Sequence, residues 1–171
     1  MSPQVVYWLD KTDRIVNVNK AWDDFALANN GQSVTRDHVL GRNLRNFLTG
    51  DTTQMFMDLV LQKARSSSET ITYPYRCDSP GLKRFMEMNV VPMGNDLLML
   101  IHTCLREETM KPQLFIRPSQ RNVRVKRCSI CNKINRGSYW EEAWEGFHRL
   151  VERVWLEVLY DVCPTCVIEP N

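Results

Sequence analysis

Two cysteine pairs near the end of the chain constrain its fold more than any other feature. Cys128-Ser-Ile-Cys131 and Cys163-Pro-Thr-Cys166 are C-x-x-C motifs separated by residues 132–162. Two thiolates three positions apart can bind one metal ion from a tight turn, and two such turns complete a tetrahedron of sulfur ligands. The sequence therefore predicts one zinc ion bound by Cys128, Cys131, Cys163 and Cys166.

Four protein sulfurs leave no coordination position open for a water molecule, so we expect this zinc to be structural and not catalytic. The segment 128–171 is too short to be held by a hydrophobic core alone. Zinc binding can supply the missing free energy, on the order of 10 kcal/mol. Iron, unmetallated thiols and disulfides are the alternatives. A dithiol redox motif fits poorly, because two pairs flank one segment.

Composition and the N-terminal residues bear on the compartment. Of the 171 residues, 43% are hydrophobic and 25% are charged, as in soluble globular proteins. The chain has no run of about 18 apolar residues that could span a membrane. Its first residues, MSPQVVYWLD, lack the features of a secretory signal. With six cysteines and no export signal, we expect a cytoplasmic protein with reduced thiols.

Charge is unevenly distributed along the chain. Residues 1–108 contain 12 basic and 13 acidic residues, which gives a net charge of −1. Residues 109–140 contain 8 basic and no acidic residues, a net charge of +8, and residues 141–171 contain 2 basic and 7 acidic, a net charge of −5. The three values sum to the overall +2. The chain is therefore basic only in its middle segment.

Hydrophobic periodicity indicates an α+β fold in the first part of the chain. Residues 5–9 and 14–18 alternate as two short strands around a polar turn. Asn19 is a plausible N-cap of a first helix, and Asp51 or Thr52 can cap a second. Three further strands are expected, at 69–77, 84–92 and 97–105. This order predicts a five-stranded antiparallel sheet with helices on one face.

The remaining segments predict a connector and a small C-terminal subdomain. We expect a first domain at 1–108, a basic connector at 109–127 and a zinc-binding subdomain at 128–171. The run Leu114-Phe115-Ile116 within the connector can form one strand or pack on the first domain. From Tyr139 to Tyr160, apolar residues recur in steps of three and four, which predicts an amphipathic helix. The subdomain is therefore expected to be helical.

Residues 5–106 resemble a PAS domain. The matching stretches read VVYWLDKTDRIVNVNKAWDDFALAN, HVLGRNLRNFL and RFMEMNVVPMGNDLLMLIHT. The resemblance implies a five-stranded antiparallel sheet whose concave face, closed by short helices, can hold a small molecule. Such domains sense ligands, light or redox state and often form dimers.

The residues expected to line a ligand pocket of the PAS-like half are Trp8, Trp22, Leu44, Met86 and Met88. The stretch from Gly41 to Leu48 resembles the flavin-binding motif of light-sensing PAS domains, but Leu44 stands at the position of the reactive cysteine. A flavin–thiol adduct is therefore not expected. The resemblance also implies where haem would bind, because haem-binding PAS domains usually carry a histidine on the helix after this motif. Residues 51–66 contain no histidine, so haem is not expected either. The identity of any ligand stays open.

The C-terminal segment resembles a small cysteine-rich segment that follows sensory domains in bacterial signalling proteins. The shared features are the Cys-Ser-x-Cys knuckle, a Gly followed by Trp140, and the final Cys-Pro-x-Cys. Here the spacing from Gly137 to Trp140 is one residue longer than in that segment. The resemblance implies metal binding and bacterial signalling.

Three classes of function compete. The first is a non-enzymatic sensory or adaptor module that acts through a protein partner, with homodimerisation as the default expectation. The second is a nucleic-acid-binding regulator, in which the basic connector and the zinc segment contact phosphates. An enzyme is not expected, since the sequence shows no phosphate-binding glycine loop, no recognisable pair of catalytic carboxylates and no open metal site. No membrane contact is expected.

Overall fold

The computed structural model describes residues 3–119, 125–145 and 152–167. It consists of two compact units, which we describe separately. The first unit contains residues 1–48, 57–74 and 86–105. The second contains residues 49–56, 75–85 and 106–171. The boundaries expected at residues 108 and 127 stay a prediction.

The first unit is built on a five-stranded sheet with the strand order β2-β1-β5-β4-β3. Both neighbours of β1 pair with it in antiparallel fashion, and Tyr7 lies opposite Val18 on one side and Leu100 on the other. The five strands are β1 (Val5–Leu9), β2 (Ile15–Val18), β3 (Ile71–Arg76), β4 (Leu82–Pro92) and β5 (Leu98–Thr109). The predicted five-stranded antiparallel sheet with helices is confirmed, and the unit is PAS-like.

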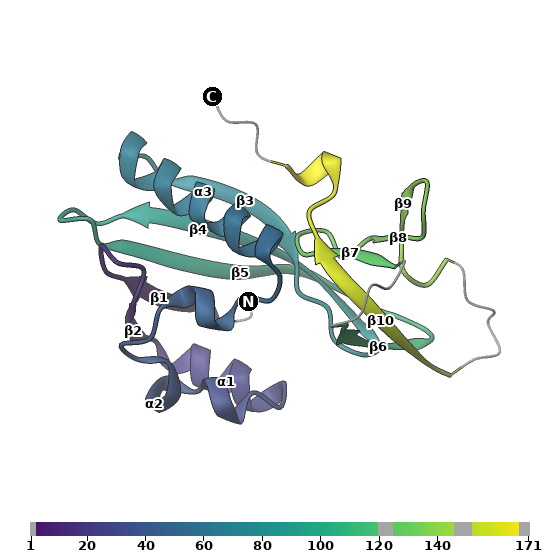
Figure 1. Cartoon of the computed structure of the whole chain (residues 1–171). Coiled ribbons are helices and arrows are strands. Elements are labelled where there is room, and N and C mark those ends of the chain that lie inside the picture. Colours follow the sequence, from purple (N-terminus) through teal and green to yellow (C-terminus); the bar gives the residue numbers. More distant parts are fainter. Residues whose placement is uncertain (1–2, 120–124, 146–151, 168–171) are drawn as a thin grey trace. The chain divides into compact units, whose positions relative to one another are not determined.

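Helices and short turns connect β2 to β3 (Figure 1). They are α1 (Lys20–Ala28), η1 (Gln32–Val34), α2 (Arg36–Val39), η2 (Leu44–Phe47) and α3 (Asp51–Ser67). Asn19 is the N-cap of α1, as predicted, and its side chain accepts a hydrogen bond from the Trp22 backbone N–H at 3.1 Å. α1 packs against β1, where the rings of Trp22 and Tyr7 meet edge to face at 5.2 Å.

Strand alternation decides which sheet residues enter the core of the first unit. On β4, Met86, Met88 and Val90 are buried, while the residues between them are only half-buried. Leu98 and Leu100 are fully buried on β5. The helical side of this core is apolar as well, and its most buried residues on α3 are Val60, Leu61 and Ala64.

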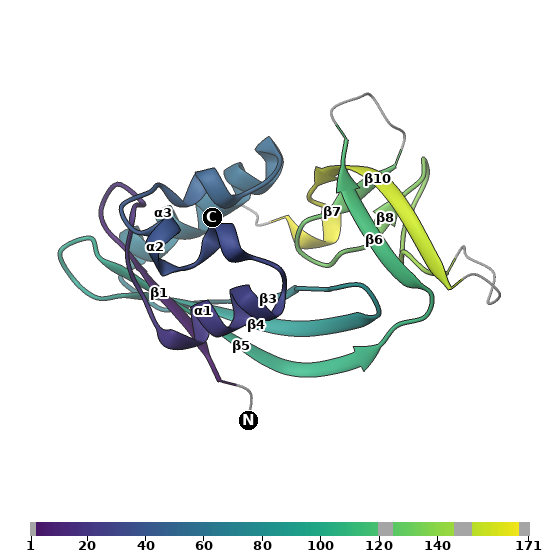
Figure 2. The same ribbon diagram turned by 90° about the horizontal axis from the view of Figure 1, so that it is seen from below.

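The second unit contains a separate five-stranded sheet with the order β6-β10-β7-β8-β9 (Figure 2). Its strands are β6 (Gln113–Pro118), β7 (Lys126–Cys128), β8 (Ile134–Asn135), β9 (Trp140–Glu141) and β10 (Arg153–Asp161), and a short turn, η3 (Pro164–Cys166), follows β10. β10 runs parallel to both β6 and β7, whereas β8 is antiparallel to both of its neighbours, β7 and β9. A core of Met110, Leu114, Ile134 and Ala143 packs under this sheet.

The predicted helix from Tyr139 to Tyr160 is wrong for the residues that the structure describes. Residues 140–141 form β9 and residues 153–161 form β10, while 147 and 151 of the predicted apolar stripe lie outside the described residues. In β10, Val154, Leu156 and Val158 turn inward and Trp155 and Glu157 turn outward. This period of two is that of a strand. The C-terminal subdomain is therefore a β structure and not a helical one.

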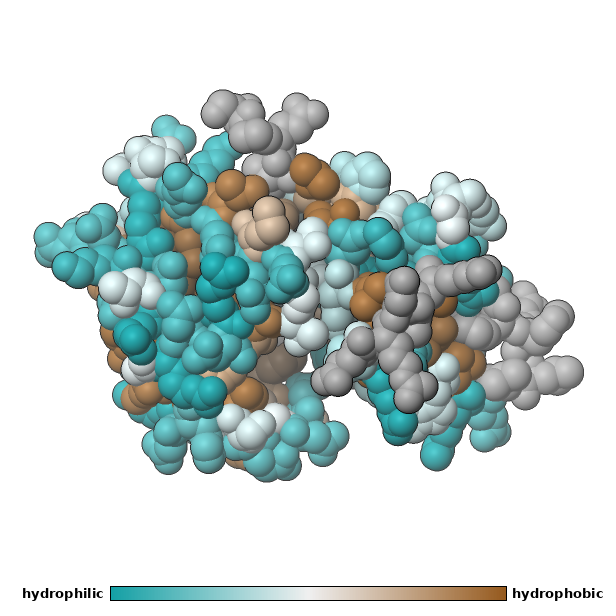
Figure 3. All heavy atoms as spheres, viewed as in Figure 1, coloured by the Kyte–Doolittle hydropathy of each residue, from teal (hydrophilic) through white to brown (hydrophobic). Residues whose placement is uncertain are grey.

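No helix in the described ranges is long and apolar enough to cross a membrane. In the view of Figure 3, the first unit presents mostly hydrophilic residues, with hydrophobic ones in small separate areas. Scattered exposed apolar residues of this kind are normal on folded proteins.

Candidate metal centre

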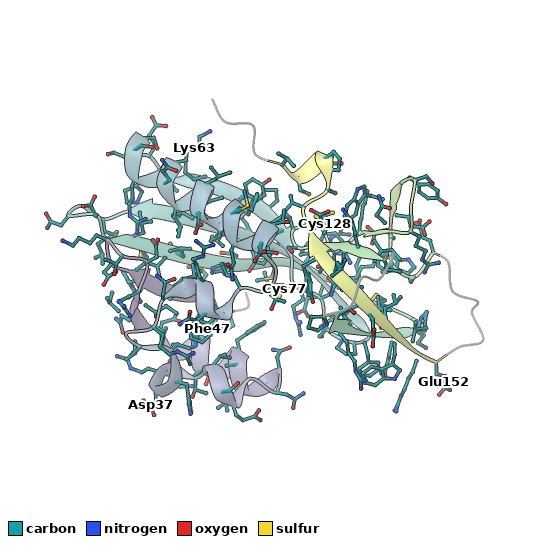
Figure 4. All side chains as sticks on the ribbon, in the orientation of Figure 1. Asp37, Phe47, Lys63, Cys77, Cys128 and Glu152 are labelled. Carbon is teal, nitrogen blue, oxygen red and sulfur yellow. The ribbon has the colours of Figure 1, made fainter. Side chains whose placement is uncertain are left out.

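The parallel pairing of β7 and β10 explains how two cysteine pairs far apart in sequence meet. Parallel strands end at the same edge of a sheet, and here Cys128 at the end of β7 lies opposite Asp161 at the end of β10. The first knuckle continues directly from β7, and Cys163 follows β10 by two residues. Figure 4 shows Cys128 at this end of β7. Both C-x-x-C motifs are therefore delivered to one edge of the sheet.

The four predicted ligands do come together. The sulfur atoms of Cys128, Cys131, Cys163 and Cys166 all lie within 4.8 Å of one another. The Cys131 and Cys163 sulfurs are 3.7 Å apart. A tetrahedral zinc ion with Zn–S bonds of about 2.3 Å holds its ligand sulfurs about 3.8 Å apart. The cluster thus fits a closed four-thiolate site of the structural type.

Backbone N–H groups surround the sulfur of Cys128. The amides of Ile130 and Cys163 lie 3.4 Å from this atom, and the amide of Cys131 lies 3.5 Å from it. A hydrogen bond from the Cys131 thiol and these amides lower the pKa of the Cys128 thiol to about 5. The same contact raises the pKa of Cys131, and burial raises the pKa of Cys166 to about 12. The protein therefore favours a thiolate at Cys128, the form that binds metal.

The turn of the first knuckle depends on Asn132. This residue has φ 60°, and its N–H donates to the Cys128 carbonyl at 3.0 Å. Asparagine adopts this left-handed conformation more easily than other residues except glycine. The Cys128 N–H in turn donates to the Lys133 carbonyl at 2.8 Å. These bonds fold the chain so that Cys128 and Cys131 point to the same side.

Arg76 holds the knuckle from outside the sheet. Its backbone N–H donates to the Ile130 carbonyl at 2.7 Å, and its carbonyl accepts from Asn132 Nδ2 at 3.3 Å. Its side chain forms ion pairs with Asp78 and, at 2.7 Å, with Glu142. The side chains of Arg76 and Asp78 are each only 7% exposed. A buried charge network of the second unit is thus attached to the metal-binding turn.

Sequence reasoning missed Arg76 and Asn132. The structure buries the side chains of both Arg76 and Asp78. The position of Asn132 directly after a C-x-x-C motif was a usable signal, because a turn that brings two thiolates together needs a residue with positive φ. Nothing in the sequence pairs Arg76 with a turn more than fifty residues away.

The predicted ligand-pocket residues of the PAS-like unit occupy different surroundings. Met86 and Met88 are buried on β4, and Leu44 is buried at the start of η2. The Trp22 indole N–H donates to the Val34 carbonyl at 2.7 Å. Trp8 is half-buried on the face of β1 opposite to Tyr7 and Leu9. The assignment of these residues to a ligand stays a prediction, and the strand alternation separates Trp8 from Met86 and Met88.

Several charges of the basic connector are already paired or buried. Lys126 Nζ lies 2.8 Å from the Asp161 carboxylate, and Arg136 lies 3.9 Å from Glu141. Arg127 is only 8% exposed. Arg121 and Arg124 lie outside the described residues. β6 places part of this connector in the second sheet, so the strand is formed, the first of the two alternatives for residues 114–116.

Comparison with known proteins gives structural but not sequence relatives. No protein-family model matches the chain, and no curated protein matches it. The structure is similar to the PAS domain of Bordetella pertussis BvgS, with 21% identity, 60% of this chain and 73% of that chain covered, and a TM-score of 0.42. It is also similar to the PAS domain of the Cronobacter turicensis RpfR quorum-sensing receptor in complex with C12:0, with 11% identity, coverages of 62% and 97%, and a TM-score of 0.47.

A third similar structure is a domain of an HTR-like protein from Haloarcula marismortui, with 15% identity, coverages of 61% and 100%, and a TM-score of 0.44. All these TM-scores are below 0.5. We therefore base the description as PAS-like on the strand order and on the helices between β2 and β3.

Proposed function

We propose that this chain is a non-enzymatic sensory or adaptor module of bacterial signal transduction. In this proposal the PAS-like unit binds a small molecule or a protein partner. A structural zinc ion on Cys128, Cys131, Cys163 and Cys166 holds the second unit in shape. The observation that carries the proposal is the cluster of four sulfurs within 4.8 Å of one another, because such a set closes the metal to substrates.

The set of four thiolate ligands also supports a non-enzymatic role. Catalytic zinc sites use three protein ligands and keep a fourth position for water. Here four thiolates converge, so a bound zinc has no position at which to activate a water molecule. We infer that the metal acts on the stability of the unit and that any signal leaves through protein contacts.

The proposal includes a homodimer formed through the outer face of the first sheet. Trp8 lies opposite Met99, and Val6 lies opposite Ile101, in the pairing of β1 with β5. These four apolar side chains are half-buried in the single chain. Association of two copies would remove the rest of this apolar surface from water. Trp8→Glu is expected to give a monomer in light scattering, and a dimer of this variant would exclude this face as the interface.

Nucleic-acid binding receives less support. Lys126 is paired with Asp161, and Arg127 is buried, so the phosphate-binding stripe expected from the sequence is reduced. Retention of DNA or RNA on a filter at low salt, falling steeply as salt increases, would restore this alternative.

A native mass spectrum of the purified chain tests the main proposal. We expect one zinc per chain, a dimer mass, and either a retained organic molecule or none. A retained molecule would identify a ligand sensor, whereas its absence would favour a protein-binding adaptor. A chain with four intact thiols and no metal would refute the zinc site.

A further inference from the structure

A cavity of about 290 Å³ lies within the second unit. Phe115, Trp144 and Tyr160 line it, and Trp155, which is 57% exposed, borders it on the outer side. Polar groups of Asp78, Ser79, Arg127 and Asn132 face the same space. Pockets for small molecules combine an apolar lining with a few polar groups, and this volume is near the lower end of their range.

Arg127 is the unusual member of this wall. It is only 8% exposed, and its Nε has no hydrogen-bond partner among the residues that the structure describes. The guanidinium group carries a permanent positive charge. Buried charges are normally paired, because an isolated one loses its hydration without compensation. An anion in the cavity would supply the missing partner.

The carboxylate of Asp78, which also faces the cavity, is engaged elsewhere. It forms a bidentate ion pair with Arg76: Arg76 Nε donates to Asp78 Oδ1 at 3.2 Å, and Arg76 Nη2 donates to Asp78 Oδ2. It also accepts from the Arg84 backbone N–H at 3.3 Å. Asp78 is therefore already paired with Arg76, a cation that it shares with Glu142, while Arg127 Nε retains hydrogen-bonding capacity.

Strand pairing holds Arg127 firmly. In β7 it lies opposite Tyr160 of β10 on one side and Ile134 of β8 on the other. Tyr160 faces the same cavity. At Trp144, another residue of the cavity wall, the ammonium group of Lys83 lies 3.2 Å from the ring centre. These contacts hold the Arg127 backbone and the Trp144 ring in place.

We propose that this cavity binds a small aromatic monocarboxylate, with the carboxylate on Arg127 and the ring among the aromatic side chains. A planar guanidinium matches a carboxylate through two parallel hydrogen bonds. Aromatic rings pack favourably on Trp and Tyr. A single negative charge suits the site better than a doubly charged phosphate, because Asp78 faces the same space.

This inference goes beyond the proposed function, since it places a ligand in the second unit and does not depend on the PAS-like unit. It also links the ligand to the metal. Arg127 directly precedes Cys128, and Asn132 directly follows Cys131. A ligand that holds both residues stabilises the metal-binding turn, so binding is expected to slow the loss of zinc to a chelator.

The first test compares benzoate with benzamide and inorganic phosphate, by titration calorimetry on the full zinc-loaded chain. Benzoate is expected to bind saturably and to change the tryptophan fluorescence, because Trp144 and Trp155 line the cavity. Benzamide has the same shape without the charge and is expected to bind at least about 10-fold more weakly. Equal binding of the two compounds, tighter binding of phosphate, or no saturable binding up to about 10 mM would overturn the proposal.

The second test uses Arg127→Gln with Arg42→Gln as its control, since Arg42 is an exposed arginine of the first unit and does not line the cavity. Arg127→Gln is expected to weaken benzoate binding at least about 10-fold, and Arg42→Gln to leave it unchanged. Undiminished binding in Arg127→Gln would refute the role of this residue. If Arg127→Gln does not fold, the comparison of benzoate with benzamide on the unaltered chain decides the question.

Zinc stoichiometry, measured on every sample, separates this inference from the proposed function. Absence of zinc with intact thiols would refute the metal proposal alone. A zinc-loaded chain that does not distinguish benzoate from benzamide would refute the cavity proposal alone.

Discussion

Cys128 and Asp161 lie opposite each other at the ends of two parallel strands, β7 and β10. The pair is reinforced by a hydrogen bond from the Ser129 N–H to the Asp161 carbonyl at 2.9 Å. Lys126, two residues before Cys128, also forms an ion pair with the Asp161 side chain. This register sets the distance between the two cysteine motifs before any metal binds. The metal site and the second sheet are therefore expected to gain or lose stability together.

Loss of one ligand should unfold the second unit. In Cys128→Ser, the buried position at the end of β7 keeps a hydroxyl that binds zinc poorly. We expect no zinc in the purified protein and fast hydrogen exchange in β7, β8 and β10, with β1 and β5 still protected. Zinc is measured by elemental analysis and protection by hydrogen exchange.

Cys104→Ser is the control, because Cys104 lies on β5 and outside the sulfur cluster. This variant should retain one zinc per chain. Loss of protection throughout the chain in Cys128→Ser would show that the two units fold as one cooperative domain.

The conformation of Asn132 gives a second prediction. Its φ of 60° is unfavourable for a β-branched side chain. Asn132→Val is expected to lower the free energy of unfolding by about 2 kcal/mol and to weaken zinc retention. Asn132→Gly keeps the turn and loses only the bond to the Arg76 carbonyl, so its change should stay within about 1 kcal/mol. Denaturant unfolding of the two variants gives the comparison, and equal destabilisation would contradict a role for the backbone conformation.

The ion pairs of Arg76 give a third prediction. In Arg76→Met, the carboxylate of Asp78 stays buried without its cation, and we expect a loss of about 3 kcal/mol in the free energy of unfolding. The matched control is Lys20→Gln. The Lys20–Asp24 pair has the same 2.7 Å distance as the Arg76–Glu142 pair, but the Lys20 side chain is 86% exposed. Its effect should stay within about 0.5 kcal/mol. Similar losses in the two variants would mean that burial does not set the value of the pair.

The strands and helices of the first unit were predictable because local sequence signals mark them, although β1 pairs with the distant β5. Asn19 marked the start of α1, and the alternation of Met86, Met88 and Val90 marked the buried face of β4. The ligand set was predictable as well, since the chemistry of four thiolates does not depend on the fold that carries them.

The second sheet was not predictable in the same way. Val154 and Val158 fit a helical spacing of four as well as a strand spacing of two, and only the half-buried position of Leu156 between the exposed Trp155 and Glu157 distinguishes the two. That burial comes from parallel pairing with β6, forty residues earlier, which local periodicity cannot reveal. Likewise, the unpaired Nε of Arg127 results from which strands surround it.

His102 gives the last prediction, a dependence of stability on pH. Its ring stacks on Tyr7 at 5.4 Å, on the face of β5 that also carries Leu98 and Leu100. Removal of the ring from water lowers the pKa of His102 from 6.5 to about 4. Burial raises the pKa of Tyr7, so its phenol is neutral in this range and offers no compensating charge.

Since the unfolded chain binds a proton near pH 6.5 and the folded chain only near pH 4, stability is complete above 6.5 and falls as the pH decreases through this interval. The loss from this group is at most about 3 kcal/mol and levels off below pH 4. His102→Phe should flatten this part of the profile, while His38→Gln, at an exposed position of α2, should leave it unchanged. Urea unfolding from pH 4 to pH 8 measures the profile, and an identical slope in His102→Phe would assign the acid sensitivity to other groups.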